Sequence, residues 1–332
     1  MTWLVTGGVG FLGSHLLRRL AVEGIRARSL DLVKAYDEPA GVDVVQGDVR
    51  DEGVLRRALD GVDVVVHAAA ALPSGGDLDS TNVAGSELLA RLASKAGVKR
   101  SILISSGVVY GLGQAPLSES AEARPIEAYG RSKLRAEHAW LAAAPAPIVL
   151  RPAAFIGPER LGVFGILFRW IQEGRRIYVL GDGSNRYQLL DVDDLVEAVI
   201  LAATSSAEGV VNVGGIVSGT VRDDLEALIA HARTRSRVVG LPARPASVAL
   251  ALLATARLSP LSKWHRRSAD RDFVLDCTRA SDLLGWSPTR SGAEALCAAY
   301  DWFVLNGSAA ASGATHRSAW RERGLAVVRR LS

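Results

Sequence analysis

The chain has 332 residues, of which 48% are hydrophobic and 22% charged, with a formal net charge of +4 at pH 7. These values are ordinary for a globular enzyme with one large α/β domain and a smaller lobe. Residues 317–332 hold five arginines and one glutamate, which leaves the rest of the chain neutral. A neutral body argues against a nucleic-acid-binding protein.

The sequence shows no membrane-spanning segment, no secretion signal and no spacing of metal ligands. No apolar run reaches the roughly 18 residues of a membrane span, and the N-terminus lacks a secretion signal. Cys277 and Cys297 have neither CxxC spacing nor a histidine partner, which is typical of reduced structural thiols. We therefore expect a cytoplasmic protein without a metal.

Through residue 152, short apolar runs alternate with amphipathic stretches. Strands are expected at 3–7, 26–32, 42–48, 62–70, 101–106 and 147–152, and helices at 13–24, 51–61, 81–97 and 128–144. Such an alternation predicts an α/β fold with a doubly wound parallel sheet, of the Rossmann type, as an NAD-binding domain over 1–152.

Beyond residue 152 the pattern loosens. Glycine and proline punctuate short elements before a helix that follows "DVDDLVEAVILAA". We expect a smaller α/β substrate lobe over 153–305, some segments of which return to the main sheet. Residues 306–332 read as a flexible linker followed by a basic amphipathic tail.

The string "VTGGVGFLG" follows the first expected strand and opens a helix. Gly8, Gly10 and Gly13 fit G-x-G-x-x-G, and Gly7 extends the match to a wider spacing. This pattern brings a backbone turn and a helix N-terminus close to a dinucleotide pyrophosphate. Asp31 ends the next strand, where a carboxylate accepts both ribose hydroxyls and repels a 2′-phosphate, which favours NAD over NADP.

Asp48, at the end of the third expected strand, has two interpretations. Its carboxylate can meet the adenine amino group, or it can cap the turn before the next helix. The sequence does not separate these.

A longer series of motifs resembles a known family. The glycine string, "GDVRD", "HAAA", "TNVAGSELL", "SSGVVYG", "YGRSK", "RPAAFIGP", "GDG", "VDD" and "LGWSP" follow one another over about 290 residues. Together they resemble the extended short-chain dehydrogenase/reductases, and within them the NAD-dependent epimerase/dehydratase family with its UDP-glucose 4-epimerase-like members.

The resemblance implies a catalytic triad of Ser106, Tyr129 and Lys133. Tyr129 is the expected acid/base, Lys133 its partner and Ser106 a donor to the substrate oxygen. A free phenol titrates near pH ~10, so a base at neutral pH needs a pKa lowered by roughly three units. A cation about 4 Å away in a medium of effective dielectric about 20 offers that amount, and we expect Lys133 to supply it.

The remaining cofactor assignments come from the same resemblance. Ala68–Ala70 are expected beside the pyrophosphate, and Asn82 near the tyrosine, whereas His67 reads as a satisfied strand-end residue. The expected NAD-binding set consists of Gly7, Gly8, Gly10, Phe11, Leu12, Gly13, Asp31, Asp48, Val49, Ala68, Ala69, Ala70, Asn82, Tyr129 and Lys133.

The two residues after Ser106 limit the types of reaction that we expect. Sugar-nucleotide 4,6-dehydratases of the family carry an Asp–Glu pair there, and this chain has Gly107 and Val108. The triad serves reversible oxidation of a secondary alcohol. Epimerisation follows if the intermediate ketone turns over and the same NADH returns hydride to its other face, and net oxidation or reduction follows if the cofactor exchanges instead. We expect an NAD-dependent epimerase of a sugar, most simply a nucleotide sugar. The alternative is an NAD(P)-dependent dehydrogenase or ketoreductase of a non-nucleotide alcohol.

Several arginines, and one arginine–aspartate spacing, are candidates for binding a diphosphate. Arg267 and Asp270 have the R-x-x-D spacing of family epimerases, although a solvated charge cluster explains them equally well. The expected substrate-binding set consists of Ser106, Gly107, Arg186, Arg267 and Asp270, with Arg160 and Arg176 as weaker candidates. Ala153 and Ala154 replace the asparagine usual in nucleotide-sugar epimerases. By resemblance alone, we expect a homodimer.

Overall fold

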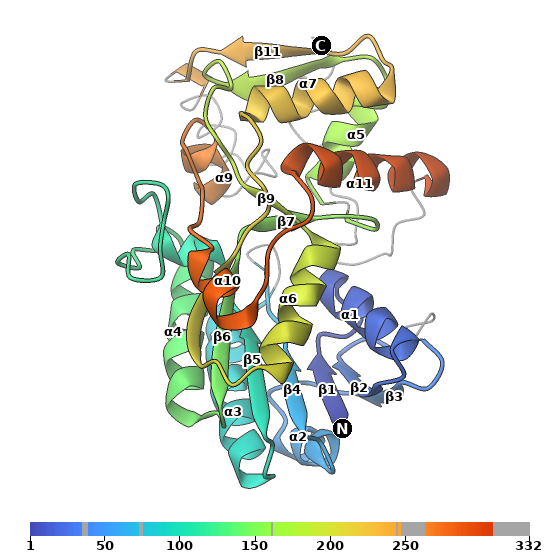
Figure 1. The fold of residues 1–332 in the computed structure, drawn as a ribbon, viewed down its shortest axis with the longest axis vertical. Helices are drawn as coiled ribbons and strands as arrows, with labels where there is room; N and C mark the ends of the chain where they lie inside the picture. The colour runs from blue at the N-terminus through green and yellow to red at the C-terminus, as the bar shows by residue number, and fades with distance from the viewer. Residues whose placement is uncertain (35–38, 73–75, 161, 244, 247–262, 308–332) are drawn as a thin grey trace.

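The computed structural model of the chain describes residues 1–34, 39–72, 76–160, 162–243, 245–246 and 263–307. Its main feature is a seven-stranded parallel sheet in the order β10-β6-β5-β4-β1-β2-β3 (Figure 1). The strands are β1 (Thr2–Thr6), β2 (Arg26–Asp31), β3 (Asp43–Gln46), β4 (Val64–His67), β5 (Arg100–Ile104), β6 (Pro147–Pro152) and β10 (Gly209–Val213). The order reverses beside β1, which confirms the predicted doubly wound fold.

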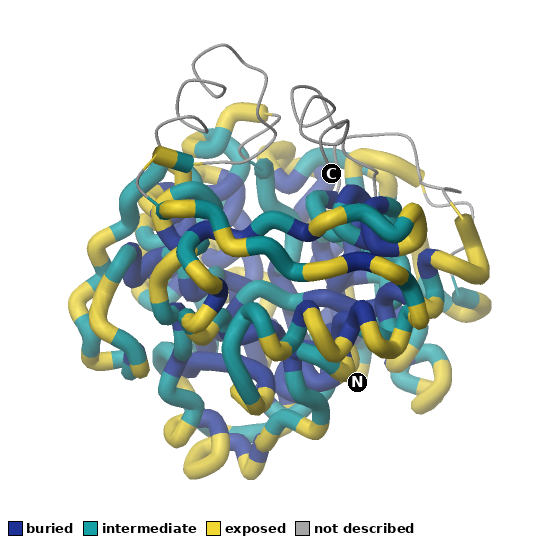
Figure 2. The backbone as a smooth tube through the Cα atoms, turned by 90° about the horizontal axis from the view of Figure 1, so that it is seen from above, coloured by how far each residue is buried: buried dark blue, intermediate teal, exposed yellow. Residues whose placement is uncertain are grey.

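Helices cover both faces of this sheet. One face packs against α1 (Phe11–Val22), α6 (Val192–Thr204) and α10 (Thr278–Leu284). The other packs against α2 (Glu52–Leu59), α3 (Ser86–Lys95) and α4 (Ala128–Ala143). Successive strand residues alternate between the two cores, as Val64 and Val66 contact one and Val65 the other. The two-sided burial explains why the strands read as continuous apolar runs (Figure 2).

The second lobe is built on two small parallel sheets (Figure 1). β7 (Ala154–Ile156) pairs with β9 (Leu189–Asp191), and β8 (Arg176–Leu180) pairs with β11 (Arg237–Leu241). A third core joins these strands to α5 (Phe164–Gln172), α7 (Val221–Ala232) and α11 (Gly292–Asn306). The short helix α9 (Lys263–Ser268) packs through Trp264 on Phe273, whose ring centroid is 5.0 Å away.

Two details differ from the expected elements. The helix expected over 81–97 is α3 preceded by a π-helical turn, η1 (Asp79–Gly85), and the strand expected over 62–70 ends at His67. The seventh strand, β10, comes from beyond residue 152 and pairs with β6. Of the linker and tail expected over 306–332, residues 308–332 lie outside the described part of the chain.

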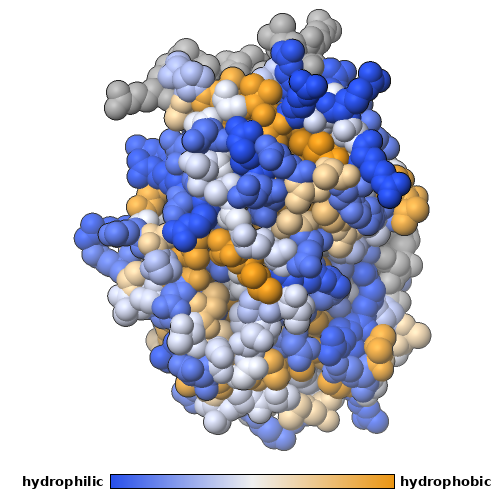
Figure 3. All heavy atoms as spheres, turned by 45° about the horizontal axis from the view of Figure 1, so that its top comes forward, coloured by the Kyte–Doolittle hydropathy of each residue, from blue (hydrophilic) through white to orange (hydrophobic). Residues whose placement is uncertain are grey.

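Within the described residues, no helix is both long and apolar enough to cross a membrane. On the face drawn in Figure 3, polar side chains predominate and hydrophobic residues form separate groups.

Candidate active site

Gly7 and Gly13, in the glycine loop between β1 and α1, lie where a side chain would collide with the backbone. Gly7 has a φ of +72°, and a Cβ on Gly13 would lie 2.1 Å from the carbonyl oxygen of Gly7. Gly10 is the N-cap of α1 and has no side chain to bond the amides of the first turn. Phosphate oxygens are the natural partners of such an end. The loop therefore fits a dinucleotide.

Asp31 lies directly beside this loop. Its Oδ2 accepts a hydrogen bond from the Val9 amide at 3.1 Å, and its Oδ1 accepts one from Val33 at 3.2 Å. Burial nevertheless raises the pKa of Asp31 above its usual value, because desolvation outweighs these amide donors. The carboxylate is thus held beside the glycine loop, and its contact with a ribose stays a prediction.

Asp48 is engaged by its own loop. Its carboxylate accepts from Arg50 Nε at 2.9 and 3.0 Å and from the Arg50 amide at 2.9 Å. These bonds hold the pKa of Asp48 below its usual value. Asp48 therefore stabilises the turn before α2, whose N-cap is Asp51, while the adenine contact stays a prediction. The adjoining Val49 is buried against Gly85.

The segment after β4 closes against the glycine loop. A Cβ on Gly7 would lie 2.7 Å from the amide nitrogen of Ala69, which itself donates to Thr6 Oγ1 at 3.3 Å. Asn82 fixes the end of this segment, since its Oδ1 accepts from the Ala71 amide at 2.7 Å and its Nδ2 donates to Ser132 Oγ at 3.0 Å. Asn82 thus joins the Ala68–Ala70 segment to α4, and its direct contact with the cofactor stays a prediction.

His67 is buried with both ring nitrogens hydrogen-bonded, as the sequence predicts. Ser86 Oγ donates to the Asn82 carbonyl at 2.6 Å, so it accepts from His67 Nε2 at 2.9 Å. The other nitrogen, Nδ1, then accepts from Thr6 Oγ1 at 2.6 Å. Burial lowers the pKa of His67 to about 3, with a smaller contribution from Lys133, so the ring stays neutral at pH 7.

The structure brings the three triad segments together at the carboxyl end of β5. Lys133 is 4% exposed, and its Nζ donates to the Ile104 carbonyl oxygen at 2.9 Å. Two residues after Ile104, Ser106 begins the short helix η2 (Gly107–Tyr110). Gly130 lies against this helix, because a Cβ there would be 3.2 Å from the Val108 carbonyl oxygen. Tyr129, in the first turn of α4, is thereby held beside the Ser106 loop.

Without a cofactor, the phenol of Tyr129 is far from ionised. Burial raises its pKa to about 12; the charge of Arg160 lowers it in part, and Glu127 raises it further. Burial likewise lowers the pKa of Lys133 to about 8, partly offset by Glu137. Desolvation of the phenolate is the largest effect on the pKa of Tyr129, and its lowering by Lys133 in the working site stays a prediction.

Sequence reasoning missed a buried charge network below the triad. Glu137, one helical turn after Lys133, accepts from Arg151 Nε at 3.0 Å and from Arg151 Nη2 at 2.6 Å. It also accepts from Ser105 Oγ. The sequence does contain a glutamate on the buried face of α4 and an arginine at the end of β6. Only the fold shows that the two side chains form an ion pair.

Among the candidate substrate residues, Arg186 is already paired within the protein. The guanidinium of Arg186 is bonded to Asp272, at 2.6 Å from Nη2 and 2.9 Å from Nε. Arg267 and Asp270 are exposed at and just beyond α9, and Arg176 begins β8. A cleft of about 390 Å³ lies nearby, lined by residues 111–115, 268 and 271–273. Arg160, by contrast, is packed against the glycine-loop residue Phe11, 5.2 Å from the ring centroid.

Gly107 has a neighbour that the sequence did not reveal. A Cβ at this position would lie 3.0 Å from Phe273 Cζ and 3.2 Å from Leu275 Cδ1. The space beside Gly107 is therefore filled by Phe273 and Leu275, which belong to the core on one face of the main sheet.

Known proteins are similar to this chain in sequence and in fold. The family model described as the NAD dependent epimerase/dehydratase family matches residues 3–214. The uncharacterised protein y4nG of Sinorhizobium fredii is 32% identical, with 98% of this chain and 85% of that protein covered. A UDP-glucose 4-epimerase of Mycolicibacterium smegmatis is 31% identical, with 91% and 98% covered.

The crystal structure of the Thermotoga maritima UDP-glucose 4-epimerase with UDP-glucose has a TM-score of 0.76 and 26% identity, with 92% of this chain and 99% of that chain covered. The similarity extends beyond the nucleotide-binding half and includes the lobe that places Phe273 over Gly107. With an open glycine loop, a tyrosine–lysine helix and a match over most of its length, this chain belongs to the NAD-dependent epimerase/dehydratase family.

Proposed function

We propose that this protein is an NAD-dependent epimerase of a sugar, most simply a nucleotide sugar. The observation that carries the proposal is the anchoring of Lys133 on Ile104, which fixes the Tyr129 helix beside Ser106 at the same sheet edge as the glycine loop. The relatives that act on UDP-glucose support the choice of substrate class. Gly107 beneath Phe273 favours epimerisation over loss of water.

The chain is an NAD-dependent enzyme of the extended short-chain dehydrogenase/reductase type, and each triad residue has a part in the proposed reaction. When bound, NAD supplies the hydride acceptor and, in the return step, the hydride donor. Tyr129 takes the proton of the substrate hydroxyl as the ketone forms and returns it when the alcohol is restored. The Ser106 hydroxyl hydrogen-bonds the same substrate oxygen.

Lys133 contributes through its charge and position. Its buried ammonium keeps α4 on the end of β5 by donating to the Ile104 carbonyl oxygen. We propose that its charge favours the ionised phenol during the reaction, as a nearby cation does. Because the pKa of Tyr129 is about 12 without cofactor, we expect added positive charge in the loaded site to be needed for proton transfer. Glu137 supports Lys133 by raising the pKa that burial lowers.

The test uses the purified protein with its bound cofactor identified by mass spectrometry. UDP-glucose and dTDP-glucose are incubated with it, sugar products are resolved by nuclear magnetic resonance, and absorbance reports any net NADH. Epimerised sugar without net NADH, lost in Tyr129→Phe, is the expected result. Stoichiometric consumption of NAD(P)H with a simple ketone, and no change in either sugar nucleotide, would establish the dehydrogenase or ketoreductase instead.

A homodimer through α3 and α4 is part of the proposal. These two helices pack side by side on one face of the sheet (Figure 1) and could pair with those of a second copy. Size-exclusion chromatography with light scattering is the direct measurement.

A further inference from the structure

Arg160 stands in a loop that is firmly held over the start of α1. The loop leaves β7 at Gly157, where a Cβ would lie 2.5 Å from Val192 Cγ1, and it turns back through a hydrogen bond from the Arg160 amide to the Gly157 carbonyl at 3.1 Å. Glu159 in this turn has a φ of +70°, a conformation that non-glycine residues rarely adopt. The turn therefore depends on its surroundings.

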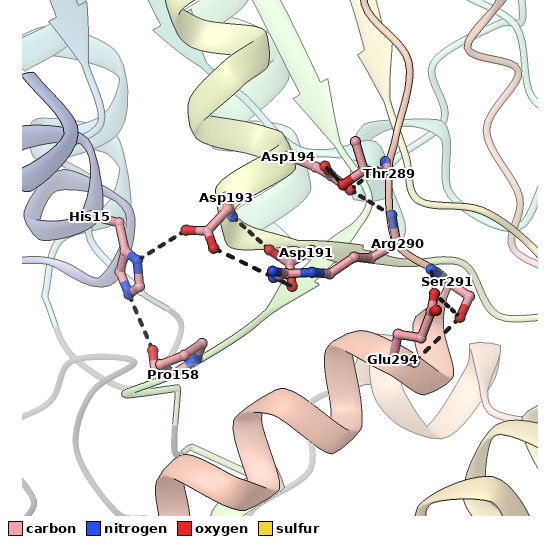
Figure 4. Close-up of polar contacts among 9 residues, drawn as sticks. All are labelled: His15, Pro158, Asp191, Asp193, Asp194, Thr289, Arg290, Ser291 and Glu294. Carbon is pink, nitrogen blue, oxygen red and sulfur yellow. Dashed lines mark hydrogen bonds and ion pairs between the residues drawn. The ribbon is translucent and has the colours of Figure 1, made fainter. Parts of the chain in front are cut away.

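Helix α1 supplies those surroundings. His15 Nε2 donates to the Pro158 carbonyl at 3.2 Å, and its Nδ1 lies 3.7 Å from Asp193 Oδ1 at the start of α6 (Figure 4). One turn later, Arg18 donates to Glu159 at 2.7 Å. The backbone of Arg160 is thus positioned by the helix whose N-terminus faces the predicted cofactor.

The guanidinium group of Arg160 lies against two aromatic rings. Its Cζ is 5.2 Å from the ring centroid of Phe11 and 5.1 Å from that of Phe155, and the two rings stack with centroids 5.7 Å apart. Phe11 is the first residue of α1. The rings hold the cation by cation–π attraction and leave its hydrogen-bonding edge for another partner.

That partner is not found within the described chain. Arg160 Nη1 is buried and has no hydrogen-bond partner there. Among the described residues, neither nearby carboxylate bonds Nη1: Glu159 accepts from Arg18 at 2.7 Å through Oε1 while its Oε2 makes no hydrogen bond, and Glu127 accepts from the Trp264 amide at 3.1 Å. Burial lowers the pKa of Arg160 to about 10, so the group is still charged at pH 7. A buried charge without a hydrogen-bond partner is costly.

The electrostatics around Arg160 favour an anion. The uncapped N-terminus of α1 carries positive partial charge. Burial, with smaller contributions from the charges of Arg160 and Arg266, lowers the pKa of His265 to about 4. Arg160 also acts on Tyr129. A negatively charged group placed among these positive groups would be attracted by all of them.

We propose that Arg160 binds a phosphate oxygen of a ligand held between the glycine loop and Tyr129. The inference rests on the proposed function, which supplies two such ligands, the pyrophosphate of NAD and the diphosphate of a nucleotide sugar. Guanidinium donors match phosphate oxygens, and bonding would satisfy the orphan Nη1. Arg160 is then a specificity residue that the glycine motif does not include.

Calorimetric titrations with NAD, and with UDP on NAD-loaded protein, test the proposal. Arg160→Met is expected to lose about 10- to 100-fold in affinity for at least one of the two. A loss for NAD alone identifies the cofactor as the source of the phosphate, and a loss for UDP alone identifies the substrate. Arg26→Met is the matched control. Arg26 is exposed at the start of β2, whereas Asp31 at the other end of this strand lies beside the glycine loop, so the substitution should leave both affinities unchanged.

Arg160→Lys is a second variant that keeps the proposal testable if Arg160→Met does not fold. It keeps the charge but not the planar donor pair, so it should show a smaller loss for the same ligand. Unchanged affinities for NAD and UDP in the folded Arg160→Met, or in Arg160→Lys if the former does not fold, would overturn the proposal, as would wild-type protein that binds neither. Because these are binding measurements, their failure is distinct from a failure of the turnover test.

Discussion

Glu137 and Arg151 form an ion pair that is almost completely shielded from solvent, with 1% and 7% of their side chains exposed and 2.6 Å between Oε2 and Nη2. The pair joins α4 to the end of β6 directly beneath the triad. Glu137 also acts on Lys133, one turn earlier in the same helix. The helix that carries Tyr129 and Lys133 is therefore held by a buried ion pair outside the proposed triad.

Removing one member of this pair should be strongly destabilising. Glu137→Gln leaves Arg151 without its counter-ion, and we expect the free energy of unfolding to fall by about 3–5 kcal/mol in urea titrations. Glu52→Gln is the control: Glu52 pairs with Arg56 on the surface and should cost less than about 1 kcal/mol. The double variant Glu137→Gln/Arg151→Met should recover part of the loss. A single variant as stable as wild type would show that the pair is dispensable.

Lys133 gives stability a specific dependence on pH. Its pKa falls from 10.5 to about 8 by burial, so between these values the unfolded chain binds a proton that the native chain does not. As the pH rises through this window, the free energy of unfolding should increase by at most about 1.4 kcal/mol per pH unit. Below pH 8 both states are protonated, and this gain is absent.

Unfolding titrations at pH 7.5, 8.5 and 9.5 isolate the effect of Lys133 by comparison with Lys133→Met. The stability of wild type relative to the variant should rise as the pH increases. A difference that stays constant across the three values would mean that Lys133 keeps its ordinary pKa in the fold.

Gly107 should not tolerate the acid that a dehydratase carries next to Ser106. Gly107→Asp must fit a side chain within 3.0 Å of Phe273, and we expect overpacking to lower the free energy of unfolding by about 1–3 kcal/mol. Phe273→Ala in the same chain should relieve part of the crowding. Thermal unfolding measures both. If Gly107→Asp is fully stable and releases a dehydrated sugar detectable by mass spectrometry, the packing argument is wrong.

The local parts of this molecule could be predicted from sequence because their causes are local. The buried parallel strands follow from continuous apolar runs, and the glycine loop follows from the steric demands of Gly7 and Gly13. Tyr129 and Lys133 share a helix face because they are four residues apart. These relationships need no knowledge of distant segments.

Long-range contacts could not be predicted in the same way. Arg186 is bonded to Asp272, which lies 86 residues away, and nothing in its own motif reveals this partner. Similarly, Arg151 and Phe273 acquire their roles only when β6 and the second lobe come together. The pKa of Tyr129 depends on how completely the fold removes water, which a sequence pattern does not report.

The most direct test is the turnover number of Tyr129→Phe with a sugar nucleotide that wild type converts, measured beside its affinity for NAD. The substitution removes one hydroxyl and keeps the ring in the first turn of α4. We predict that kcat falls by about 10²- to 10⁴-fold while NAD binding is unchanged. A variant that binds NAD normally and turns over at the wild-type rate would contradict proton transfer by Tyr129.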